Sequence, residues 1–242
     1  MADTGAVAAT PFARARGLLL RAVPTPRRNP FALGYLSLLL GTTLFARAAD
    51  PRLVHRLQAL SSTDVHNLTH HPLLALVTSG CWVAGPVWTP YLWAFAVTVA
   101  PLERRVGPLR AAGVFAAGHV GATLLSQGVL LAAVALGGPG ADALDALDIG
   151  VSYGVLASLG ALAGLLAPRW RAAALGAAAV LIGHQLLTDP DLLTGVGHPA
   201  ALLIGVALWR PLRRGPRTPR RPLRRRAARR PARTAGGAAA SA

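Results

Sequence analysis

Apolar residues form long blocks along the chain and do not alternate with polar residues at the period of a helix or a strand. Those periods are typical of the half-buried elements of soluble proteins. Each block is close to the ~20 residues that a helix needs to cross a bilayer, where backbone groups must bond within their own helix. The pattern predicts an all-α polytopic membrane protein with six transmembrane helices, at residues 31–46, 87–102, 109–136, 149–166, 172–187 and 192–209.

The connection between the first two blocks, residues 50–86, is long for a compact membrane domain. Long connections often carry structure or function of their own. Its apolar stretch at residues 73–83 could lie in the membrane interface, with Trp82 and Trp88 as aromatic anchors.

The basic residues, all of them arginine, indicate how the helices are oriented. They gather in four segments: 14–28, 104–110, 169–171 and 210–233. The connections before the fourth and sixth blocks are acidic instead and include Asp142 and Asp191. Because basic connections stay in the cytoplasm, both termini are predicted to be cytoplasmic, in a bacterial plasma membrane. One connection disagrees, since Arg47, Arg52 and Arg56 follow the first block on the predicted outer side.

The composition excludes two classes of protein. Hydrophobic residues make up 53% of the 242 residues and charged residues 14%, against about 25% charged in ordinary soluble domains. A disordered chain would have far fewer apolar residues, and a soluble globule would not collect them in long blocks. Cys81 is the single cysteine, which excludes an internal disulfide and a zinc site built on thiolates.

Three segments of the chain are predicted. Residues 1–30 form a basic cytoplasmic segment, residues 31–209 the membrane domain, and residues 210–242 a disordered Arg-rich cytoplasmic tail. The charged leader is unusually long for a signal peptide, so a cleavable signal ending near Ala46 is the less favoured interpretation. The tail is expected to attract anionic lipids rather than nucleic acid, since no aromatic residue follows Trp209.

Two polar residues inside the blocks carry candidate chemistry. Ser152 lies near the outer end of the fourth block and His198 in the outer part of the sixth, at a similar depth on the same side. Polar residues within membrane helices are costly and are functional candidates by default. A neighbouring base makes a serine hydroxyl nucleophilic, so this pair could support peptide hydrolysis. The structural alternatives are a serine bonded within its own helix and a packing histidine.

Small residues recur every four positions on the same two blocks. They are Gly150, Gly154 and Ser158 on the fourth block, and Ala201 and Gly205 on the sixth. Such stripes allow two helices to approach closely, although they are common in membrane bundles of every kind.

Four patterns point to one known family. In chain order they are Pro101-Leu102-Glu103-Arg104-Arg105-Val106-Gly107, Gly118-His119-Val120-Gly121-Ala122, Gly150-Val151-Ser152 and His198-x-x-Ala201-x-x-x-Gly205. They resemble the G-x-x-x-E-R-x-x-G segment after helix two, the Gly-rich third helix, the G-x-S-G nucleophile motif and the H-x-x-G-x-x-x-G pattern of helix six. These are features of the rhomboid family of intramembrane serine proteases, which the chain resembles over roughly residues 78–205.

The resemblance implies a six-helix rhomboid-like bundle in which Ser152 is the nucleophile and His198 its base. It implies a transmembrane protein as substrate or client, and neither a cofactor nor a metal. Other matched positions would support packing: Gly150, Gly154, Ala201, Gly205, Glu103 and Arg104. Two features depart from the family, since Tyr153 replaces the glycine after the serine and residues 87–92 lack the helix-two His and Asn that help to hold the oxyanion.

Three functions fit these observations. A rhomboid-type serine endopeptidase would cut single-pass membrane substrates near the outer surface. A catalytically inactive relative would bind transmembrane helices as a scaffold or chaperone, which Tyr153 and the missing His and Asn favour. A small transporter is the least favoured, because no internal repeat is evident.

The remaining histidines have simpler interpretations. His119 is expected to form a hydrogen bond between helices. His66, His70 and His71 have a spacing that a metal could use, but no carboxylate or cysteine stands at a defined offset. A solvated loop or the start of a helix is therefore the favoured interpretation of that stretch.

Overall fold

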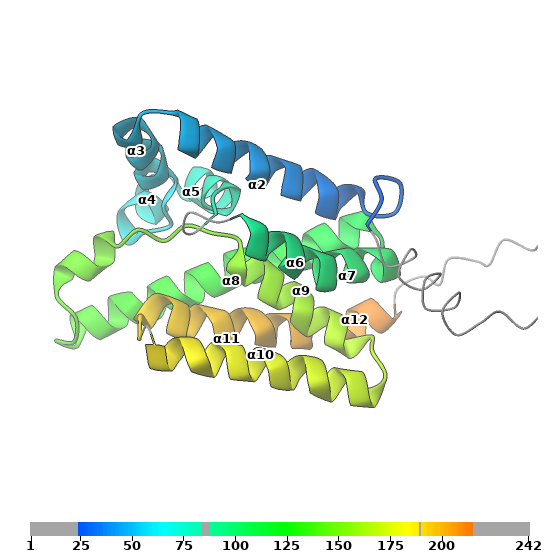
Figure 1. Cartoon of the computed structure of the whole chain (residues 1–242). Helices are drawn as coiled ribbons and strands as arrows, with labels where there is room; N and C mark the ends of the chain where they lie inside the picture. The colour runs from blue at the N-terminus through cyan, green and yellow to red at the C-terminus, as the bar shows by residue number, and fades with distance from the viewer. Residues whose placement is uncertain (1–23, 84–87, 189, 215–242) are drawn as a thin grey trace, which may run out of the picture.

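The structure is a computed structural model that describes residues 24–83, 88–188 and 190–214. Within these ranges every regular element is helical (Figure 1). The elements are α2 (Pro30–Ala48), α3 (Pro51–Ser61), α4 (Val65–His70), α5 (Pro72–Thr78), η1 (Ser79–Cys81), α6 (Thr89–Val97), α7 (Val99–Val106), α8 (Pro108–Ala135), η2 (Ala141–Asp145), α9 (Ser152–Gly164), α10 (Pro168–Thr188), α11 (Leu192–Ala207) and α12 (Trp209–Arg214).

Four helical stretches in the described part of the chain are long and apolar enough to cross a membrane. They are α2, α8, α10 and the run of α11 with α12. The predicted second block is instead divided at Thr98 into α6 and α7, because Pro101 has no N–H for the carbonyl of Val97. The fourth block becomes α9, whose 13 residues span about 20 Å. The all-helical membrane fold is therefore confirmed, whereas the count of six crossings stays a prediction.

Helices α8, α9 and α11 pack against one another, and α10 lies outside α9 and α11 (Figure 1). Glycines make the close approach possible. A Cβ on Gly118 of α8 would collide with Ala157 of α9, and a Cβ on Gly205 of α11 would collide with the carbonyl of the same Ala157. Gly160 of α9 in turn faces the carbonyl of Leu202. Gly205, from the stripe predicted on the sixth block, therefore lies in direct backbone contact with α9. On α9 this contact involves Ala157 and Gly160, whereas Gly154 of the stripe predicted on the fourth block packs against Phe115 of α8.

A buried carboxylate holds the start of α2 against α7. Glu103, which is 1% exposed, accepts hydrogen bonds from the backbone N–H groups of Phe31 (2.8 Å) and Ala32 (2.9 Å). Arg104 donates to the side-chain oxygen of Asn29 at 3.2 Å. A carboxylate is favourable at this position because the first N–H groups of a helix lack intrahelical acceptors. Glu103 and Arg104 thus lie in a structural contact away from Ser152.

The long connection after α2 forms α3, α4, α5 and η1, which gather at one end of the bundle (Figure 1). Caps start the first two helices, because Asp50 accepts from the N–H of Leu53 and Asp64 from that of Asn67. Trp82, expected as an interfacial anchor, is 8% exposed because it packs beside α2. This connection is structured, and it covers the segment that leads into α9.

The two described ends of the chain lie at the same end of the bundle (Figure 1). Residues 210–214, expected to belong to a disordered tail, continue as helix α12. Two contacts with α9 hold it: Trp209 Nε1 donates to the Gly160 carbonyl at 2.6 Å and Arg213 Nε to that of Gly164 at 3.0 Å. Residues 1–23 and 215–242 lie outside the described residues, and so do most of the predicted basic terminal segments.

Candidate active site

Ser152 is the first residue of α9 and follows an irregular segment that side chains of the long connection hold in place. Gly150 has a φ of 136°, a conformation that favours glycine, and its N–H donates to the carbonyl of Ser79 at 3.0 Å. The preceding Asp148 accepts at Oδ2 from Thr63 Oγ1 (2.9 Å) and Gln127 Nε2 (3.1 Å). These bonds fix the segment, so Ser152 starts its helix at a defined position.

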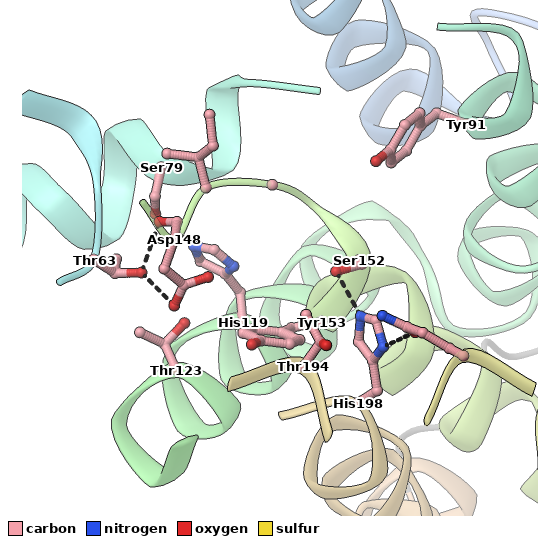
Figure 2. Close-up of a pocket in the computed structure, with 13 residues that line it drawn as sticks. Thr63, Ser79, Tyr91, His119, Thr123, Asp148, Ser152, Tyr153, Thr194 and His198 are labelled. Carbon is pink, nitrogen blue, oxygen red and sulfur yellow. Dashed lines mark hydrogen bonds between the residues drawn. The ribbon is translucent and has the colours of Figure 1, made fainter. Parts of the chain in front are cut away.

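His198 of α11 faces Ser152 across the contact between α9 and α11. Its Nε2 lies 3.0 Å from Ser152 Oγ, and a dashed line joins these two labelled side chains in Figure 2. Its Nδ1 lies 2.7 Å from Oε1 of Gln185 on α10. Both distances are ordinary for hydrogen bonds. The sequence predicted that Ser152 and His198 lie at a similar depth, and in the structure their side chains are in contact.

Tyr153 lies beneath the imidazole of His198. Its hydroxyl donates to the carbonyl of Leu193 at 3.2 Å, and its ring meets the His198 ring edge to face at 5.5 Å. Gly197 makes room for that ring, because a Cβ there would collide with it. Tyr153 is 4% exposed, so its ring is buried inside the bundle against His198.

A polar cavity of about 220 Å³ opens beside Ser152 and His198 (Figure 2). Its other lining residues come from several elements: Thr63, Ser79, Tyr91, His119, Thr123, Asp148, Ile149, Gly150, Tyr153, Gln185 and Thr194. Among the described residues, Nδ1 of His119 and Oγ1 of Thr123 are buried in this region without a hydrogen-bond partner. Buried polar atoms are normally satisfied, so the cavity has the polarity and the volume to hold water.

A second cavity of about 200 Å³ reaches the same pair from the side. It lies between α6, α9 and α10, and besides Ser152, Gln185 and His198 its lining is mostly apolar: Pro90, Tyr91, Ala94, Val155, Leu156, Leu181 and Ile182. Ser152 and His198 therefore border both a polar cavity and an apolar one.

Residues 26–219 match the model of a protein family described as rhomboid-like protein, and this range covers most of the 242-residue chain. The chain belongs to the rhomboid-like protein family. Comparisons with curated proteins and with solved structures gave no match. The family resemblance of the sequence motifs is thus confirmed, and the chain is a rhomboid-type membrane protein.

Other predicted site residues of this rhomboid-like protein lie around the pair. Gly150 shapes the segment before Ser152, and Gly154 packs against Phe115, because a Cβ there would collide with that ring. Ala201 is fully buried and Gly205 contacts α9, both on α11 below His198. These residues position the helices.

Sequence reasoning missed three contributors to this site. Gln185 lies on a helix with no matched motif, and nothing in its local sequence indicates that it faces His198. Thr63 and Ser79 lie in the long connection, whose length alone indicated a role. Only the packing of α3 to η1 against the start of α9 brings these side chains to Ser152.

His119, His66 and His70 make their contacts with residues other than Ser152 and His198, although His119 lines the same polar cavity. His119 Nε2 is 3.1 Å from Ser79 Oγ and 3.1 Å from the carbonyl of Leu76, so it links α8 to α5 and η1 as predicted for an interhelical partner. His66 and His70 stack on the exposed helix α4, with 4.3 Å between ring centroids. In the described ranges, no group of three or more His, Cys, Asp or Glu residues could hold a metal ion.

Proposed function

We propose that this rhomboid-like protein is an intramembrane serine endopeptidase that cleaves single-pass membrane proteins near the outer surface. The observation that carries the proposal is the 3.0 Å distance between Ser152 Oγ and His198 Nε2. A serine hydroxyl needs a base within hydrogen-bond reach, and this contact supplies one.

In this mechanism Ser152 Oγ attacks the carbonyl carbon of the scissile peptide while its proton passes to Nε2 of His198. The tetrahedral intermediate collapses to an acyl-enzyme as His198 returns the proton to the leaving amine. Water then attacks the ester, loses a proton to His198 and releases the new carboxyl end with Ser152 restored. The polar cavity beside the pair is suited to supply that water.

The start of α9 offers donors for the oxyanion. The first bond inside this helix runs from the N–H of Val155 to the carbonyl of Val151, so the N–H groups of Ser152 and Tyr153 precede it. They lie where the helix dipole favours negative charge. Tyr91 of α6 lines both cavities and occupies the helix-two region that carries the missing His and Asn in the family. These groups are the candidates for oxyanion stabilisation.

The membrane substrate class is supported by the apolar cavity. A transmembrane segment could reach Ser152 between α6 and α10, where the lining residues are apolar. The same cavity equally supports the second candidate, an inactive scaffold or chaperone that binds transmembrane helices. Residues 87–92 lack the His and Asn that the family carries on helix two, which favours this alternative.

Labelling by a fluorophosphonate probe in detergent separates the two functions. We expect wild type to be labelled at Ser152, located by mass spectrometry of the modified peptide. Ser152→Ala should abolish labelling, and His198→Ala should lower its rate by at least about 10³-fold because the base is lost. Ser158→Ala is the matched control, since Ser158 is buried on the same helix and bonds the carbonyl of Gly154. A folded wild-type chain that stays unlabelled, or a labelled Ser152→Ala variant, would contradict the protease and favour the scaffold.

A further inference from the structure

We infer that Gln185 is a positioning residue that fixes the tautomer of His198 and aims its free nitrogen at Ser152. A role of Gln185 in catalysis rests on the proposed function. The tautomer of His198 does not, because it can be measured in the protein without substrate. The two can therefore be tested separately.

The geometry places the imidazole between two oxygens. Oε1 of Gln185 is 2.7 Å from Nδ1, and Oγ of Ser152 is 3.0 Å from Nε2 on the opposite edge of the ring (Figure 2). The three side chains come from three helices, α10, α11 and α9. A histidine held at both ring nitrogens has its orientation determined by both partners.

An amide oxygen only accepts hydrogen bonds, so a neutral His198 must carry its proton on Nδ1 to bond Gln185. Nε2 is then unprotonated and accepts from the Ser152 hydroxyl, which is the arrangement that a general base requires. The opposite tautomer would present an N–H to Ser152 and a lone pair to the amide oxygen. Gln185 disfavours that arrangement because two acceptors would face each other at 2.7 Å.

No other side chain offers an acceptor to Nδ1 among the contacts of His198 in the described part of the protein. Tyr153 of α9 contacts the ring by its edge and gives its hydroxyl hydrogen to Leu193. Asp191, at the start of α11, accepts from the N–H of Thr194. Gln185 is therefore the residue whose removal would leave Nδ1 without its partner.

A neutral amide suits this location better than a carboxylate. Gln185 is half-buried on a helix that the apolar cavity borders, and an ionised side chain there would lose hydration. A glutamine can orient the ring as a carboxylate does but places no full negative charge beside it. The consequence is a base held in the correct tautomer without a strong preference for its protonated form.

The first measurement reads the tautomer directly. Full-length protein labelled with ¹⁵N at histidine is studied by NMR in detergent, with His198→Ala used to assign the His198 signals. We expect wild type to show a protonated Nδ1 and an unprotonated Nε2, and Gln185→Leu to shift the population toward protonated Nε2. Gln58→Leu, the same change at a half-buried position outside the two cavities that border Ser152, should leave the His198 signals unchanged. A wild-type ring protonated on Nε2, or an unchanged tautomer in Gln185→Leu, would overturn the inference.

The second measurement is the rate of fluorophosphonate labelling at Ser152 as a function of pH. Gln185→Leu is expected to lower the rate about 10- to 100-fold, which corresponds to the loss of one buried hydrogen bond. Gln185→Glu retains the acceptor and adds charge, so labelling should persist with the acidic limb of its pH profile moved to higher pH. A wild-type rate in Gln185→Leu would overturn the inference.

The two measurements separate the possible failures. If wild type is unlabelled but the tautomer depends on Gln185, the positioning role stands and the protease proposal fails. If Gln185→Leu does not fold, Gln185→Glu decides alone, and an unmoved acidic limb would overturn the inference.

Discussion

At the scale of single residues, the carboxyl group of Asp148 helps to hold the segment that leads to Ser152, so the stability of that segment depends on pH. Its half-buried carboxyl accepts from Thr63 and Gln127 in the segment before α9. Burial raises the pKa of Asp148, and these two donors only partly oppose that effect. The folded protein therefore binds a proton more tightly here than the unfolded chain does. The associated stability is complete below the ordinary pKa of about 3.9 and is lost as pH rises through the folded-state pKa.

Asp148→Asn should remove this pH-dependent loss, because the amide keeps an oxygen for Thr63 and Gln127 but carries no charge. We expect the variant to melt at a higher temperature than wild type at pH 7 and to approach wild type at pH 4. Thermal unfolding in detergent across this range measures the difference. Asp142→Asn, at an exposed position of η2, is the control and should follow wild type. A variant less stable than wild type at every pH would show that the charge itself is needed.

At the scale of elements, the contact between α9 and α11 determines whether Ser152 and His198 can meet. The helices approach closely because Gly205 lies directly on the backbone of Ala157 and Ala161. His198 also precedes Pro199, which lies inside α11 and leaves the carbonyl of Gly195 without its usual helical donor. Backbone contact in the last two turns of α11 therefore sets the geometry of the site one to two turns away.

Gly205→Ala is expected to destabilise the protein by about 1–3 kcal/mol, because its Cβ would overlap the α9 backbone and force the helices apart. Labelling at Ser152 should fall with it. Gly176→Ala on α10 is the matched control, since nothing lies within 4 Å of the place its new methyl group would occupy and alanine favours a helix by up to ~1 kcal/mol. Thermal unfolding of both variants in one detergent gives the comparison. Equal melting temperatures would contradict the close-contact argument.

For the whole molecule, the positions of the arginines and of the two ends of the described chain indicate an orientation in the membrane. The described chain starts and finishes at the same end of the bundle (Figure 1), which requires an even number of crossings if each traverse is complete. Arginines at the Glu103–Arg110 connection and on α12 lie toward that end. We propose that this end faces the cytoplasm and that Ser152 opens toward the outer surface.

Reporter fusions test this orientation. Alkaline phosphatase, which is active only outside the cytoplasm, should be active when inserted after Asp142 and inactive when fused after Ala242. A fluorescent protein that folds only in the cytoplasm should give the opposite pattern. The reverse result at both sites would mean that Arg47, Arg52 and Arg56 determine the orientation instead of the other four basic segments.

Local properties of the chain were enough to predict the helical membrane fold, the family and a common depth for Ser152 and His198. Block length, charge and motif spacing can be read from the sequence without knowing the fold. Because apolar blocks form helices across the bilayer, a residue's position in its block indicates its depth in the membrane. The stripe predicted on the sixth block identified Gly205 at the contact between α9 and α11, but the stripe predicted on the fourth block did not identify Ala157, Gly160 and Ala161, which make that contact on α9.

The side chains that complete the site depend on tertiary packing alone. Gln185 contacts His198 because α10 packs beside α9 and α11. Thr63 contacts Asp148 because the long connection packs against the segment before α9. The ring of Tyr153 contacts the imidazole of His198 because α11 packs against α9. The short α9 likewise depends on neighbours that cover irregular backbone inside the bundle, whereas the break at Thr98 follows from Pro101 in the local sequence. Such contacts join residues far apart in the chain, and no local pattern specifies the rotation of one helix against another.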